Sequence, residues 1–128
     1  MRAFKTVILA AAAFAFLATI AGCGGGGGGG GEQFGEAITL TETTSLSAIL
    51  SDPAAHDGSM VRVEGEIQTE CPSGCWFNLA EDAAVVRVDL APHGIAIPQR
   101  VGSDVVIEGT VTVTDGRVMI LGQGVELR

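Results

Sequence analysis

The residues Val105-Val-Ile-Glu-Gly-Thr-Val-Thr-Val113 alternate apolar and polar side chains, and the turn signal Asp115-Gly116 follows after Thr114. Period-two alternation is typical of a β-strand with one buried face, and Asp-Gly favours a tight hairpin. The hairpin should lead into a second strand from Val118 to Leu127. Gly122 and Gly124 interrupt that strand and predict a bulge or bend.

Three more strands precede this hairpin. The same alternation runs over 61–68, 75–79 and 86–90, with the turn signal Asp57-Gly58 in front. A longer, irregular crossover containing His93 and Pro98 occupies 92–100. Three strands, a crossover and two strands form the strand order of an OB-fold.

Closure into a barrel is the economical solution for so short a domain, because it removes most sheet edges. Gly65 and Gly109 lie in mid-strand, where a tightly coiled barrel needs room for the backbone. Leu46, Ile49 and Leu50 form one apolar stripe that predicts a short helix before the barrel, ending at Pro53. The predicted fold class is therefore all-β, a small five-stranded OB-like barrel preceded by one short helix. A small open sandwich with that helix on one face is the alternative.

The N-terminus has the features of an export signal. Arg2 and Lys5 precede an apolar run from Thr6 to Ala21, which is short for a membrane-spanning helix. The following Ile20-Ala-Gly-Cys23 resembles the bacterial lipobox. The resemblance implies that residues 1–22 are a lipoprotein signal peptide and that Cys23 becomes diacylated on sulfur, cleaved and acylated. The expected location is the cell envelope, at the outer membrane facing the periplasm if the organism is Gram-negative, because Gly24 rather than Asp follows the cysteine.

A tether and one domain follow the lipidation site. Eight consecutive glycines, Gly24 to Gly31, behave as a flexible chain with a reach of roughly 15 Å. The polar residues up to Thr44 extend this tether, so 23–44 is predicted as lipidated cysteine plus linker. Residues 45–128 are long enough for one small domain with a modest core.

The charge balance limits the possible partners. Without the signal peptide, five arginines face 15 acidic residues, a net charge of −10. This argues against nucleic acid, which needs a basic face to neutralise phosphates. Besides the membrane, reached through the lipid anchor, a metal ion or an envelope protein fits the field better.

Part of the domain resembles a known family. The stretches Cys71-Pro-Ser-Gly-Cys-Trp-Phe-Asn-Leu79, Arg87-Val-Asp-Leu90, His93-Gly-Ile-Ala-Ile-Pro98 and Val105-Val-Ile-Glu-Gly109 are similar to those of small periplasmic and lipoprotein OB-fold domains grouped as a domain of unknown function. The likeness spans about 46–127, and the Gly-Cys-Trp triplet and the downstream Pro98 are its more specific features. It implies the fold and assigns no reaction.

Cys71 and Cys75 form the chemically richest feature, and three interpretations of them compete. The first is a structural disulfide, the usual state of paired cysteines in exported domains. The second is a soft-metal site for Cu(I) or Zn, with His93 as third ligand and Met119 or His56 as a weaker fourth. The Cys-x₃-Cys spacing with a distant histidine is similar to that of Sco-type copper-delivery proteins. The third is a thiol–disulfide redox pair, although redox pairs usually have Cys-x-x-Cys spacing at a helix N-terminus.

The single tryptophan, Trp76, follows the second cysteine and points away from the predicted core. OB-folds use aromatic side chains on such strands as ligand platforms, so Trp76 marks a candidate partner face, with simple packing as the alternative. No catalytic triad, phosphate loop or zinc-protease motif is present in the sequence, which predicts a non-enzymatic protein.

These features together predict a membrane-anchored extracytoplasmic lipoprotein that acts as a binding or accessory module, with copper or other soft-metal handling through Cys71, Cys75 and His93 as its sharper form. The alternative is a structural or interaction lipoprotein with a Cys71–Cys75 disulfide. A thiol–disulfide redox protein is the third hypothesis.

Overall fold

The computed structural model describes residues 31–128. The predicted signal peptide 1–22, the lipidation site Cys23 and the glycines up to Gly30 lie outside the described residues. Within 31–128, no helix is long and apolar enough to cross a membrane.

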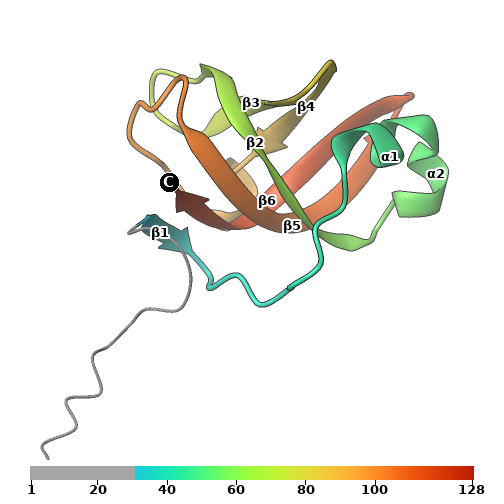
Figure 1. Ribbon diagram of the computed structural model, residues 1–128, viewed down its shortest axis with the longest axis horizontal. Helices are drawn as coiled ribbons and strands as arrows, with labels where there is room; N and C mark the ends of the chain where they lie inside the picture. The colour runs from blue at the N-terminus through green and yellow to red at the C-terminus, as the bar shows by residue number, and fades with distance from the viewer. Residues whose placement is uncertain (1–30) are drawn as a thin grey trace, which may run out of the picture.

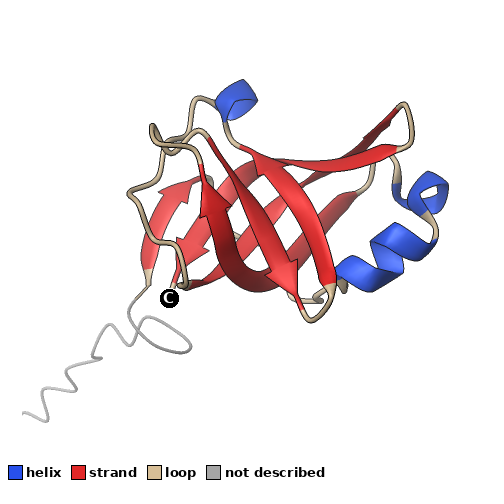
Figure 2. Ribbon diagram, turned by 90° about the horizontal axis from the view of Figure 1, so that it is seen from above, coloured by secondary structure: helices blue, strands red, loops and turns tan. Residues whose placement is uncertain are grey.

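The predicted five-stranded barrel is confirmed. Its strands are β2 (Met60–Glu70), β3 (Trp76–Glu81), β4 (Ala84–Asp89), β5 (Asp104–Thr114) and β6 (Arg117–Leu127). They pair in the closed cycle β2–β3–β4–β6–β5 and back to β2, and every pairing is antiparallel except β4 with β6. Figures 1 and 2 show the strands wrapping around a single interior.

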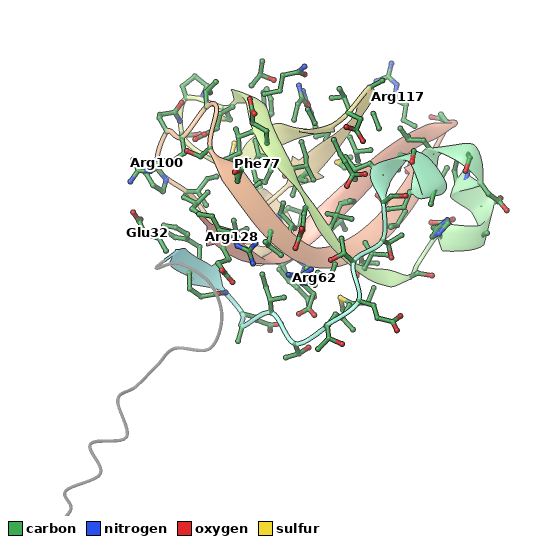
Figure 3. All side chains as sticks on the ribbon, viewed as in Figure 1. Glu32, Arg62, Phe77, Arg100, Arg117 and Arg128 are labelled. Carbon is green, nitrogen blue, oxygen red and sulfur yellow. The ribbon has the colours of Figure 1, made fainter. Side chains whose placement is uncertain are left out.

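The core consists of the inward-facing positions of the alternating strands. Phe77 and Leu79 on β3 and Val88 on β4 are completely buried, while their neighbours Asn78 and Arg87 face outward. Phe77 is the largest of the fully buried side chains and lies inside the barrel in Figure 3. Burial of these apolar faces is the main favourable contribution to folding.

Glycines allow the barrel to coil tightly. A Cβ atom on Gly109 would lie 2.3 Å from the carbonyl oxygen of Leu121 on β6. The register between β5 and β6 shifts at this level, because Glu108 pairs with Gly124 and Gly109 with Gly122. Gln123 is therefore the extra residue of a β-bulge, which confirms the predicted irregularity in this strand.

Two short helices precede the barrel, where one was predicted. α1 (Leu46–Ser51) begins at Ser45, whose side chain caps it, and its Leu46 and Ile49 join the core. Pro53 does not end the helical segment, because it occupies the first turn of α2 (Pro53–His56), where a missing N–H costs nothing. Asp52 caps this second helix by accepting a hydrogen bond from the Ala55 N–H.

The predicted tether needs a correction from Glu32 onward. Residues Glu32–Gly35 form β1, which pairs antiparallel with the end of β6, as Figure 1 shows. Residues 36–44, which we call the strap, then run along the barrel. The strap is fixed by Glu108, which is only 2% exposed and accepts hydrogen bonds from the Thr39 N–H, the Thr39 hydroxyl and the Leu40 N–H. The folded unit thus includes residues that composition alone had assigned to a linker.

The strap also explains the burial pattern of β5. Val105 to Gly109 are all buried, although only alternate residues point into the barrel. Val106 is 1% exposed yet is not part of the core cluster, and Glu108 is buried among strap atoms. The strap therefore covers the outer face of β5 at Glu108.

Candidate functional site

The loop Cys71–Cys75 joins β2 to β3 and brings the two thiols together. Their Sγ atoms are 2.9 Å apart, and both side chains are partly exposed. The Ser73 hydroxyl lies 3.1 Å from the Cys71 sulfur and donates to the Cys75 sulfur at 3.5 Å. Because a disulfide bond is about 2.05 Å long, a small movement of the sulfur atoms would close the pair.

Backbone contacts hold this cysteine loop against the crossover between β4 and β5. Gly74 adopts a φ of +73° and is buried, and its carbonyl accepts a hydrogen bond from the Ile97 N–H at 3.1 Å. The Gln99 amide donates to the carbonyls of Cys71 and Pro72 at 2.8 and 3.2 Å. The loop and the crossover are therefore one packed unit.

The loop is also closed at its base. The Cys71 N–H donates to the Trp76 carbonyl at 2.9 Å, and the Gly74 N–H donates to the Cys71 carbonyl at 2.8 Å. The Leu90 N–H donates to the Cys75 carbonyl at 2.9 Å, which attaches the second cysteine to the end of β4. These hydrogen bonds fix the positions of both thiols through the backbone.

The electrostatics of the loop favour a thiolate at Cys71. Hydrogen bonds from the Cys75 side chain, and then from Ser73, lower the pKa of Cys71 from 9.0 to about 6. A thiol with such a pKa is largely ionised at neutral pH, and the thiolate is the form that attacks disulfides and binds metals.

The structure does not gather His93 into a group with the two thiols. His93 is exposed in the 3₁₀ turn η1 (Ala91–His93), and His56 is at the end of α2 with its ring nitrogen against the Asp52 carbonyl. Over residues 31–128, no three or more His, Cys, Asp or Glu side chains are arranged to hold a metal ion. A Cu(I) or Zn role for Cys71 and Cys75 stays a prediction that rests on the pair alone.

Trp76 is the first residue of β3 and lies on the outer face of the barrel, next to the cysteine loop. The guanidinium of Arg87 stacks over its ring, with the Arg87 Cζ atom 3.8 Å from the ring centroid. Further along β3, the Asn78 amide donates to the Thr69 hydroxyl at 2.7 Å. The partly exposed side chains on this face of β3 and β4 are thus ordered by contacts with one another.

A shallow cavity of about 520 Å³ continues this face toward the β5–β6 hairpin. Met119 and Arg117 on β6 line it, together with Thr112, Thr114 and Asp115. Met119 pairs with Arg87 across the parallel contact between β4 and β6. The sequence offered Met119 as a weak metal ligand, whereas the structure places it in this cavity.

Several residues of the site were not singled out from the sequence. Ser73 contacts both sulfurs, Gln99 holds the loop, and Arg87 stacks on Trp76. Arg87 carried a detectable signal, because it is the outward-facing residue of the strand that follows Trp76 in the chain. No sequence signal pointed to Gln99, because its contacts with Cys71 and Pro72 depend on how the crossover packs against the loop.

Comparison with known proteins supports the fold. No protein-family profile and no curated protein matches this chain. Among solved structures, the hypothetical protein YgiW from E. coli is similar, with a TM-score of 0.54 and 17% identity over 69% of this chain and 91% of that one. A chain of the S. pombe Stn1–Ten1 complex has a TM-score of 0.48 at 18% identity, and the S. pombe telomere capping protein Ten1 has one of 0.45 at 20% identity. Those two cover 66% and 64% of this chain and 75% and 77% of theirs. At 17% identity, the likeness to YgiW concerns the OB-like barrel alone.

Proposed function

We propose that this chain is a lipid-anchored extracytoplasmic binding module whose partner, an envelope protein, docks on the outer face of β3 and β4. The observation that carries this proposal is the Arg87–Trp76 stack, which orders an aromatic side chain on the barrel surface. Aromatic and arginine side chains contribute the most to binding at protein interfaces.

The strap supports the choice of face. It covers the outer side of β5, whereas Trp76 and Asn78 on β3 are partly exposed and Arg87 and Val85 on β4 are exposed. Val85 is 42% exposed, which adds apolar area to the face. OB-folds bind their ligands on the corresponding strands and the adjoining loops.

The chemistry of the partner follows from the charge of the chain. A net charge of −8 for the whole sequence, more negative without Arg2 and Lys5, attracts a basic surface and repels nucleic acid and anionic lipid headgroups. The lipid on Cys23 holds the module at the membrane by its acyl chains, so the protein surface is free for the partner.

Anchoring is tested by labelling bacteria that express the full chain with palmitate. We expect label and membrane association in the wild type and the loss of both in Cys23→Ser. An unlabelled wild-type protein would overturn the lipoprotein assignment.

Docking is tested by photo-crosslinking in the same cells. A crosslinking residue at position 78, on the proposed face, should give one discrete adduct with an envelope protein, and Arg87→Ala should weaken it. The same residue at position 47, exposed on α1, is the matched control. Equal adducts from both positions, or none from position 78, would contradict the proposed face.

A further inference from the structure

We propose that Cys71 and Cys75 form a thiol–disulfide exchange pair, with Cys71 as the attacking thiol and Cys75 as the resolving thiol. The substrates are disulfides of extracytoplasmic proteins or small molecules. The inference is independent of the partner face around Trp76.

The two sulfurs of the dithiol lie close together. A separation of 2.9 Å between the Sγ atoms lets the disulfide form and open with little backbone movement. The Ser73 hydroxyl contacts both sulfurs and can hydrogen-bond to whichever of them is a thiolate.

Hydrogen bonds hold the cysteine loop in place without a disulfide. A structural disulfide stabilises a protein mainly by closing a loop that would otherwise be free, and it does so least for short loops. Here the loop has five residues, and hydrogen bonds from Cys71 to Trp76, from Ile97 to Gly74 and from Gln99 to Cys71 already close and dock it. The fold therefore tolerates the reduced state, as a pair that cycles between two states requires.

The two cysteines differ in their surroundings. Cys71 receives the contacts that favour its thiolate, and its pKa of about 6 is near the value that makes a thiol an effective nucleophile at neutral pH. Cys75 is tied to β4 through the hydrogen bond from Leu90 and is in position to attack the sulfur of Cys71.

The exchange proceeds in two steps, each of which forms one S–S bond and breaks another. The Cys71 thiolate attacks one sulfur of the substrate disulfide, a mixed disulfide forms, and the other substrate sulfur leaves as a thiolate. Cys75, after losing its proton to solvent, attacks the Cys71 sulfur, the Cys71–Cys75 bond forms and the second substrate sulfur leaves. The chain loses two electrons and the substrate gains them. The reverse sequence oxidises a dithiol substrate.

The test uses the full chain, extracted from membranes in detergent, reduced, and mixed with oxidised glutathione as the probe at pH 7. Wild type should form the Cys71–Cys75 disulfide, release two glutathione molecules, and revert in millimolar reduced glutathione. Cys75→Ser should stop at a mixed disulfide on Cys71. Cys71→Ser, which lacks the activated thiol, should attack oxidised glutathione several-fold more slowly than wild type.

The double variant Cys71→Ser/Cys75→Ser accounts for any reaction at Cys23. Thermal melts of wild type in both redox states provide a second readout that needs no variant, and the two curves should lie within a few degrees. A disulfide that glutathione reduces only after unfolding would overturn the proposal in favour of a structural role. A Cys71→Ser variant that attacks oxidised glutathione as fast as wild type would overturn the assignment of roles. Tight binding of one Cu(I) to the reduced pair, lost in either variant and blocking the exchange at physiological thiol levels, would overturn it in favour of metal handling.

Discussion

The N–H of Ile97 donates a hydrogen bond to the carbonyl of Gly74, so the tip of the cysteine loop and the crossover of the barrel are joined by their backbones. A Cβ atom at position 74 would lie 2.0 Å from the carbonyl oxygen of Ile97, and the φ of +73° disfavours any other residue there. The backbone conformation and the close contact with Ile97 thus explain why the Gly-Cys-Trp triplet begins with glycine.

We predict that Gly74→Ala undocks the loop and lowers the free energy of unfolding by about 2 kcal/mol, because it combines an unfavourable φ with a backbone clash. Urea denaturation of the soluble chain Gly24–Arg128 measures this. Gly94→Ala is the matched control, since its φ is also positive but a Cβ there meets nothing within 4 Å. Equal losses in both variants would show that φ alone matters and that docking against Ile97 contributes nothing.

The lowered pKa of Cys71 predicts the pH dependence of its alkylation. In the reduced chain, the rate of Cys71 modification by iodoacetamide should rise around pH 6 and become flat above about pH 8. Cys75→Ala removes the largest cause of the shift, so the inflection should move toward 9. Mass spectrometry that resolves the two cysteines measures both rates. A wild-type inflection near pH 9 would refute the assignment of Cys71 as the activated thiol.

The same shift links stability to pH. Because the pKa is lower in the folded than in the unfolded chain, folding of the reduced protein gains stability as the pH rises from about 6 toward 9 and has none of this contribution below about 6. The gain is small, because the group is exposed and solvent screens it. Urea midpoints of reduced wild type and Cys71→Ser should therefore diverge only above pH 6. Parallel curves over the whole range would contradict the linkage.

The Arg87–Trp76 stack predicts a fluorescence and stability signature. Arg87→Ala should expose the ring, shift the emission of the only tryptophan to the red and cost about 0.5–1 kcal/mol, the range of an exposed cation–π contact. Arg117→Ala, in the hairpin cavity, is the control and should leave the emission unchanged. An unchanged spectrum in Arg87→Ala would show that the stack does not persist in solution.

The barrel was predictable because apolar and polar side chains alternate along its strands. Positions 77, 79, 86 and 88 are buried as their period-two pattern indicated, and Asp115-Gly116 forms the expected turn with both residues at positive φ. β1 was missed because Glu32-Gln-Phe-Gly35 is too short to show a period, and its one apolar anchor, Phe34, only partly packs on the core. Composition alone assigns these four residues to the linker, because they follow a run of glycines. Only their pairing with β6 shows that they form a strand.

The candidate site was predictable in part. Cys71, Cys75 and Trp76 stood out by residue type, and the structure places them side by side in one loop and the strand that follows. The contribution of His93 could not be judged, because chain spacing does not say where a crossover turn lies relative to a hairpin loop. The alternating pattern puts Glu108 on the polar face of its strand and does not show that the strap buries it, because residues up to Thr44 are predicted as tether.

Glu108 is the residue by which the strap can be tested. Glu108→Ala removes the acceptor for three hydrogen bonds from Thr39 and Leu40, so we predict a loss of about 2 kcal/mol, below the full value because the freed groups regain water. Hydrogen exchange of the amides of Thr39 and Leu40 should accelerate strongly. Glu108→Gln, which keeps one carbonyl oxygen, should have a smaller effect.

The matched control is Glu126→Ala. Glu126 forms an ion pair with Arg128 at 3.4 Å in which both side chains are partly exposed, and such pairs contribute less than about 1 kcal/mol. Its removal should leave exchange at Thr39 and Leu40 unchanged. If these amides stayed protected in Glu108→Ala, the hydrogen bonds to Glu108 would not be what fixes the strap. Its covalent connection to β1, which pairs with β6, would then hold it in place.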